Sequence, residues 1–170
     1  MAKLLKTKAM GRLRPHRPIL VPVDFSKPSS AALAWAAALA AKLGVPIVVL
    51  HVVHDPESEP GFYSRPKRAG SLTRMEDAAK EIMNSFMAKM RKKHSSLRTL
   101  KGVHEYIVIG LPSNRILEVA ESIDARHIVL GSQGRTGLSR VLLGSKAERI
   151  VQLAPVPVTI VKDLPRRGRR

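Results

Sequence analysis

Cysteine is absent from this chain, which excludes a disulfide framework and thiolate chemistry. Aromatic residues make up only 4% of the sequence, so few side chains are available to stack on the bases of single-stranded nucleic acid. No apolar stretch approaches the ~18 uninterrupted residues of a membrane span. The N-terminus also lacks the apolar core of a secretory signal. We therefore expect a cytoplasmic protein.

Acidic residues are scarce as well. The chain has 13 Asp and Glu against 30 Lys and Arg, which gives a net charge of +17. The excess is concentrated at the two ends, since residues 1–18 carry six basic residues and no acid, and residues 162–170 carry five basic residues and one acid. This distribution predicts disordered basic tails at 1–17 and 163–170 around one domain at 18–162.

Three functions are open for these tails. Contact with nucleic acid or another polyanion, without sequence readout, is one. Solubility, or adaptation to an unusual cell interior, explains the charge equally well. A transit peptide at the N-terminus is the weakest of the three, although the segment is rich in arginine and free of acids.

Short apolar runs alternate with helical patterns along the middle of the chain. The expected strands are residues 19–23, 46–53, 104–109, 127–130 and 156–162. The expected helices are residues 26–44, 72–95, 112–125 and 145–154, with an irregular loop at 54–70. Most of the strands are continuous β-branched runs without polar alternation, which indicates a parallel sheet covered by helices on both faces. In this α/β fold, ligands bind beyond the carboxyl ends of the strands.

A glycine-rich loop follows the fourth expected strand. It contains Gly131, Gly134, Gly137 and Gly144. Glycine allows a ligand to approach backbone N–H groups closely, and the N-terminus of the next helix favours anions. Ser145 and Glu148 have the spacing of a capping box, which makes Ser145 the expected N-cap. A phosphate-binding loop and a simple tight turn both remain open, as does the direction in which Glu148 points.

No catalytic set is visible in the sequence. The loop is neither a Walker A sequence nor a Rossmann G-x-G-x-x-G turn. A phosphotransferase needs a metal-binding acid near the phosphates and a positioned base, but Glu148 is the only acid of the loop and helix. The six histidines lack the spacing of metal ligands. We therefore predict no metal site and no catalytic residue.

The pattern Gly131-x2-Gly134-x9-Gly144-Ser145 resembles the nucleotide loop of the universal stress protein family. The segment ILVPVDFS at 19–26 is similar to the family's opening strand, and LHVV at 50–53 to its second strand. Residues 110–162 resemble its C-terminal half almost without interruption. The chain is thus identified as similar to single-domain members over residues 18–162, with both basic tails outside the match.

This resemblance implies a doubly wound, five-stranded parallel sheet of Rossmann-like order 3-2-1-4-5, with ATP, alone or with magnesium, at the switch between strands 1 and 4. Carried over residue by residue, the adenine and ribose would be held by Pro22, Asp24 and the backbone of Val52. The ribose would also lie beside Leu130 and Gly131. The phosphates would be contacted by Gly134, Gly144 and Ser145.

The function implied by the resemblance is that of an ATP-binding stress-response module which regulates rather than catalyses. It also implies a homodimer formed through the last strand, at 156–162. The alternatives are a nucleic-acid-associated protein acting through its tails and a slow ATPase. Two further points stay open. Asp24 and Ser26 are equally good candidates for the N-cap of the first long helix. The alternative to a dimer is a last strand whose edge is shielded by the basic C-terminal tail.

Overall fold

The computed structural model of the chain describes residues 5–6, 17–54, 71–133 and 143–162. The expected loop at 54–70 lies outside these residues apart from His54, and so do most of the expected basic tails.

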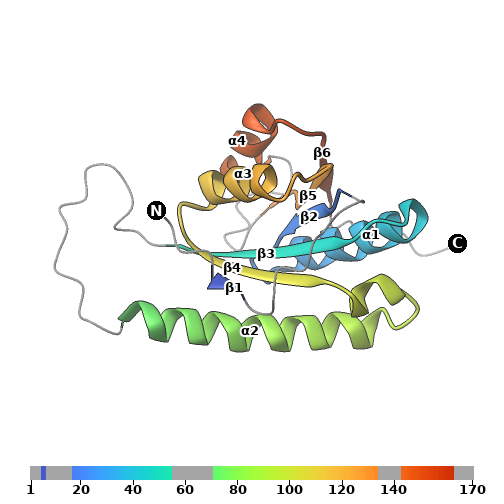
Figure 1. The fold of residues 1–170 in the computed structure, drawn as a ribbon, viewed down its shortest axis with the longest axis horizontal. Helices are drawn as coiled ribbons and strands as arrows, with labels where there is room; N and C mark the ends of the chain where they lie inside the picture. Colours follow the sequence, from blue (N-terminus) through green and yellow to red (C-terminus); the bar gives the residue numbers. More distant parts are fainter. Residues whose placement is uncertain (1–4, 7–16, 55–70, 134–142, 163–170) are drawn as a thin grey trace, which may run out of the picture.

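One sheet forms the centre of the molecule, with strand order β1-β4-β3-β2-β5-β6 (Figure 1). Its parallel strands are β2 (Ile19–Pro22), β3 (Ile47–His54), β4 (His104–Gly110), β5 (His127–Gly131) and β6 (Val158–Val161). Numbered along the chain, these five strands have the order 3-2-1-4-5, which confirms the predicted fold. The sequence did not predict the two-residue strand β1 (Leu5–Lys6), which pairs antiparallel with β4.

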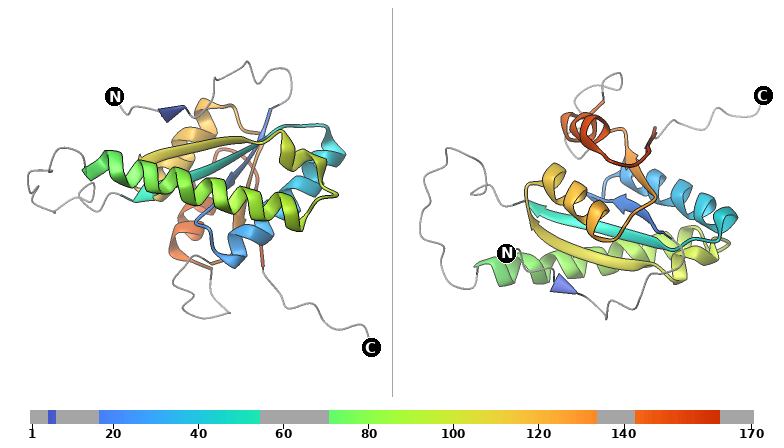
Figure 2. Two further views of the ribbon diagram at one scale, coloured as in Figure 1. Left: turned by 90° about the horizontal axis from the view of Figure 1, so that it is seen from below. Right: turned by 45° about the horizontal axis from the view of Figure 1, so that its top comes forward.

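Helices cover both faces of this sheet (Figures 1 and 2). On one face lie α1 (Lys27–Leu43) and α2 (Ser71–Lys93), and on the other α3 (Pro112–Ser122) and α4 (Ser145–Leu153). A short 3-10 helix, η2 (Arg98–Lys101), which was not predicted, connects α2 to β4. No described helix is long and apolar enough to cross a membrane.

The continuous apolar runs exist because each strand needs apolar side chains on both of its faces. Ile19 and Val21 of β2 pack in the core beneath α1 and α2, whereas Leu20 packs in the core beneath α3 and α4. All three side chains are fully buried. Since successive side chains of a strand point to opposite faces, a strand in the middle of two helical layers has no polar positions.

The ends of α1 follow from local signals in the sequence. Ser26 is the N-cap, and its hydroxyl accepts a hydrogen bond from the Ser29 amide at 3.3 Å. Pro28 lies in the first turn, where its missing N–H is no loss. Gly44 ends the helix in the left-handed conformation, with φ of 63°. Only four residues separate β2 from α1, so the start of α1 is fixed close to the carboxyl end of that strand.

Arg17, which the charge pattern assigns to the N-terminal tail, is attached to the folded part. Its guanidinium donates to the carbonyl oxygens of Asp124 and Ala125, each at 3.2 Å, and pairs with the Asp124 carboxylate at 3.0 Å. Asp124 has a positive φ of 50° in the turn between α3 and β5. The arginine thus holds this turn against the start of β2.

Candidate functional site

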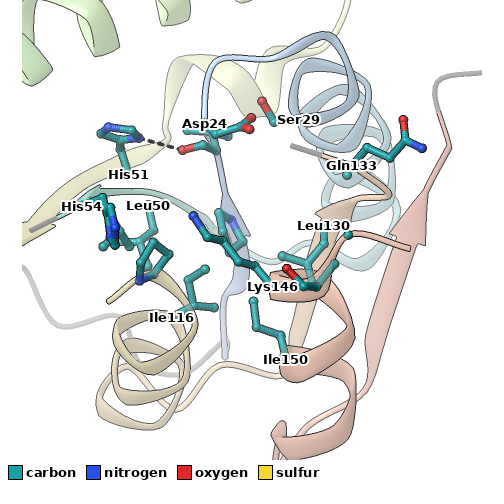
Figure 3. A pocket seen from close by; sticks show the side chains of 18 residues that line it. Asp24, Ser29, Leu50, His51, His54, Ile116, Leu130, Gln133, Lys146 and Ile150 are labelled. Carbon is teal, nitrogen blue, oxygen red and sulfur yellow. Dashed lines mark hydrogen bonds between the residues drawn. The ribbon is translucent and has the colours of Figure 1, made fainter. Parts of the chain in front are cut away.

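A cavity of about 240 Å³ opens at the carboxyl ends of β2, β3 and β5 (Figure 3). Strands β2 and β5 are neighbours in the sheet, although β3 follows β2 along the chain. The strand order therefore reverses between β2 and β5, which is where open α/β sheets bind their ligands. The first residues of α3 and α4 complete the wall of the cavity.

The structure brings seven of the eight predicted site residues to this one cavity. The lining residues include Pro22, Asp24, Val52, Leu130, Gly131, Gly144 and Ser145. The eighth, Gly134, lies outside the described residues. These seven come from β2, β3, β5 and α4 or lie within two residues of them, so four separate segments converge on the same space.

One side of the cavity is apolar. Leu50, Ile116 and Ile150, which were not predicted, line it together with Leu130 (Figure 3). All four are buried and belong to the core beneath α3 and α4. In the sequence they are indistinguishable from other core residues, and only the packing of the helices leaves a gap between them. Such a gap suits the faces of a flat ring that carries hydrogen-bonding atoms at its edge.

Asp24 stands at the cavity wall and also supports the start of α1. Its Oδ1 accepts hydrogen bonds from the Ser26 amide at 3.1 Å and from the Ser26 hydroxyl. Ser26, not Asp24, is therefore the N-cap, and Asp24 orients it. Both contacts use Oδ1, so the geometry is compatible with a second role for the carboxylate as an acceptor toward the cavity.

The predicted capping box at α4 is wrong. Gly144 is the N-cap, in an extended conformation with φ −64° and ψ 140°, and no side chain caps the helix. The Gly144 amide donates to the Ser132 carbonyl at 3.1 Å, which keeps Gly144 outside the helix, while the Gly144 carbonyl accepts from Glu148 N–H at 2.9 Å. Ser145 is thus the first helical residue. Glu148 is exposed and is not one of the residues that line the cavity.

This helix start changes which backbone donors face the cavity. The Gly144 amide, a predicted phosphate contact, is already bonded to Ser132. The amides of Ser145, Lys146 and Ala147 are in the first turn of α4, where no intrahelical acceptor exists. These three residues line the cavity, and the Lys146 side chain extends across it (Figure 3). The start of α4 therefore offers an anion three backbone donors, the positive end of the helix dipole and an ammonium group.

Gly131 also has a packing role that the sequence did not predict. A Cβ atom on Gly131 would lie 2.7 Å from the carbonyl carbon and 2.9 Å from the carbonyl oxygen of Pro28. The glycine thus lets the first turn of α1 approach β5 closely. Access for a ligand is not the only reason for glycine at this position.

His51 lines the cavity from β3, and its Nδ1 lies 2.8 Å from the Val23 carbonyl oxygen. A carbonyl only accepts, so Nδ1 carries the proton in this contact. Among the described residues, no group of three or more His, Asp or Glu is placed to hold a metal ion.

Comparison with known proteins identifies relatives of this chain. Residues 15–162 match the model of the universal stress protein family. A universal stress protein of Methanocaldococcus jannaschii is 33% identical over 147 residues, which cover 86% of this chain and 82% of the relative.

Solved structures share the fold. The universal stress protein UspA of Lactobacillus plantarum has a TM-score of 0.65 at 25% identity, covering 86% of this chain and 97% of that one. A universal stress protein of Archaeoglobus fulgidus, solved in complex with dAMP, has a TM-score of 0.59 at 25% identity, covering 86% and 98%. The chain belongs to the universal stress protein family.

Proposed function

We propose that this protein binds an adenine nucleotide, ATP with magnesium, in the cavity between β2 and β5, and that it regulates rather than catalyses. The observation that carries the proposal is the convergence of seven predicted residues on a cavity with two chemically different sides. The relative from Archaeoglobus fulgidus that was solved with dAMP supports an adenine nucleotide as the ligand.

Each part of a nucleotide has a matching part of the site. The apolar side lined by Leu50, Ile116 and Ile150 accepts the base. Asp24 accepts a hydrogen bond from a ribose hydroxyl, and the first turn of α4 with Lys146 binds phosphate. The site residues in this proposal are the predicted eight, with Ser145–Ala147 replacing the Gly144 amide as backbone donors.

Regulation is favoured over catalysis by the shortage of acids. Asp24 is the only acidic residue among the described residues that line the cavity, and it already orients Ser26. Phosphoryl transfer needs an acid for the metal and a positioned base. We therefore expect any ATP hydrolysis to be slow compared with that of a dedicated ATPase.

Calorimetric titration of magnesium-ATP into nucleotide-free protein tests the proposal. Lys146→Glu should weaken binding by about tenfold or more, because hydrogen bonds to charged groups contribute ~1.5–3 kcal/mol. Arg149→Glu is the matched control, since it makes the same charge change on an exposed α4 residue outside the cavity. Absence of saturable binding by the wild type, or equal losses in the two variants, would contradict the proposal.

We further propose a cytoplasmic homodimer that forms through β6. This strand is at the edge of the sheet and is only partly buried, so it presents unpaired backbone groups to a partner strand. Sedimentation velocity over a concentration series checks this. A monomer at every concentration would contradict it and would favour shielding of the edge.

A second function, binding of nucleic acid or another polyanion, is favoured by the position of the charge. Ten of the 17 net positive charges fall within residues 1–18 and 162–170. Such binding would be sequence-independent and strongly weakened by salt.

A further inference from the structure

A second hollow lies on the other face of the sheet, between α1 and α2. This α1–α2 groove has a volume of about 560 Å³. It is lined by Phe25, Ser30, Glu81, Ile82, Ser85, Phe86, Lys89, Met90 and Lys93. None of these residues lines the nucleotide cavity, but Phe25 directly follows Asp24, which does.

The backbone at Phe25 is in an unusual conformation. Its φ is +66°, and only one other described non-glycine residue, Asp124, has a positive φ. This conformation is disfavoured for a bulky side chain and is kept only when the surroundings impose it. Here the residues on both sides impose it, because Asp24 is hydrogen-bonded to Ser26, which is itself fixed as the N-cap of α1.

The Phe25 ring lies between the two hollows. On one side it packs against the imidazole of His51, with ring centroids 4.2 Å apart and planes at 35°. On the other side it meets Phe86 of α2 edge to face, with centroids 5.4 Å apart. His51 lines the nucleotide cavity, and Phe86 lines the groove. Three rings in contact therefore connect the cavity to the opposite face of the sheet.

We propose that Phe25 couples the nucleotide cavity to the α1–α2 groove, so that binding of the nucleotide changes the shape of the groove. This inference rests on the proposed function. A ligand that contacts Asp24 and His51 changes the constraints on Phe25, because Asp24 helps to fix its backbone and His51 packs against its ring. The Phe25 backbone then moves toward a relaxed conformation and its ring shifts against Phe86. By linkage, a substitution or ligand that changes the shape of the groove also changes the affinity for the nucleotide.

The absence of cysteine makes a direct test straightforward. Ser85→Cys places a single thiol in the groove, and a bimane label on it reports the local environment. Asn84→Cys is the control, because Asn84 is an exposed α2 residue that does not line the groove. Magnesium-ATP is titrated into both labelled proteins, and calorimetry of the same samples measures nucleotide binding separately.

We expect the label at position 85 to change its fluorescence with ATP, and the label at 84 to stay constant. In the Phe25→Gly background, glycine keeps the left-handed turn without the ring, so the fluorescence change is lost while calorimetric binding persists. Phe86→Leu, which breaks the ring contact from α2, should give the same loss and serves if Phe25→Gly folds poorly.

The outcomes separate the two proposals. Heat of binding without a change at position 85, or with a change that survives both substitutions, overturns the coupling and leaves nucleotide binding in place. Absence of binding heat in every labelled protein and in the unlabelled wild type overturns the proposed function and the coupling with it.

Discussion

The close approach of α1 to β5 depends on the absence of a Cβ atom at Gly131. This residue, at the end of β5, lies against the backbone of Pro28. Any side chain at this position would clash with Pro28 in every rotamer, because the Cβ atom itself is too close. The same residue lines the cavity in which we propose that the nucleotide binds. Substitution at Gly131 therefore affects stability and the shape of the site together.

Gly131→Ala is expected to destabilise the protein by about 1–3 kcal/mol, the usual cost of overpacking. Urea unfolding followed by circular dichroism measures the loss. Gly102→Ala is the control, because Gly102 has no atom within 4 Å of an added Cβ and no positive φ. Equal stability of the two variants would show that α1 can move away from β5 without loss.

From the environment of His127 we expect a specific pH dependence of the protein's stability. Burial, with a smaller contribution from the Arg126 charge, lowers the pKa of His127 below its usual 6.5. The unfolded chain then binds the proton more readily than the folded protein, so stability falls as the pH drops through 6.5 toward the lowered pKa. Its Nε2 also lies 2.7 Å from the Thr159 hydroxyl of β6, so protonation acts at the β5–β6 pair.

Replacement of His127 should remove its contribution to the pH dependence of stability. For His127→Gln, the difference in unfolding free energy between about pH 7.5 and about pH 5.5 is expected to be smaller than for the wild type. Urea midpoints at the two pH values check this. An unchanged difference would mean that other groups set the pH response.

At the scale of elements, Arg91 holds three segments together. From the last turn of α2 its Nε donates to the Leu100 carbonyl of η2 at 3.0 Å, and its guanidinium pairs with Glu105 of β4 at 2.7 Å. Lysine has one compact donor group and cannot reproduce both contacts. The connection between α2 and β4 therefore depends on the shape of the guanidinium as well as on its charge.

Arg91→Lys should cost about 1 kcal/mol, the typical net value of one hydrogen bond. Thermal unfolding provides the measurement. Lys92→Arg, a conservative exchange in the reverse direction at the next, exposed residue, should leave stability within about 0.5 kcal/mol. A full loss of cooperativity in Arg91→Lys would indicate a larger role than these two contacts explain.

Elements with local signals were predicted well from the sequence. The bounds of α1 follow from Ser26, Pro28 and Gly44, all within one turn of its ends. The N-cap of α4 was predicted one residue too late, at Ser145 instead of Gly144, because the deciding contact, from Gly144 to Ser132, crosses a loop. β1 and η2 were missed because each depends on contacts with β4 or α2 rather than on its own pattern.

The same distinction between local signals and tertiary contacts applies to the site residues. Asp24 and Gly131 were predictable, since they follow or end expected strands and parallel strands bring their carboxyl ends to one edge of the sheet. The other predicted site residues rested on the family resemblance. The apolar side was not predictable, because Ile116 and Ile150 face the cavity only through the packing of α3 and α4. Lys146 was not assigned to the site either, since its direction depends on where α4 begins.

At the scale of the whole molecule, the position of the charge along the chain separates the two proposed binding functions. Removal of residues 1–16 and 163–170 should abolish binding to heparin or duplex DNA, because most of the charge in those tails is lost. Nucleotide binding should persist, since every described lining residue lies between Pro22 and Ile150. Anisotropy of labelled DNA at several salt concentrations, with calorimetry in parallel, measures both. Joint loss in a folded truncation would refute this division.

The order of the elements along the chain also determines which face of the sheet is uncovered while the chain is being synthesised. Strands β2, β3 and β4, which lie side by side in the sheet in the order β4-β3-β2, emerge with α1 and α2, and these helices can cover one face at once. The other face, with Leu20, Leu50 and Val108, stays bare until α3 and α4 have been made. For that interval the nascent chain presents an apolar surface at an unfinished sheet, a feature that binds chaperones or promotes aggregation. The protein's yield in cells should therefore depend on chaperone supply during translation.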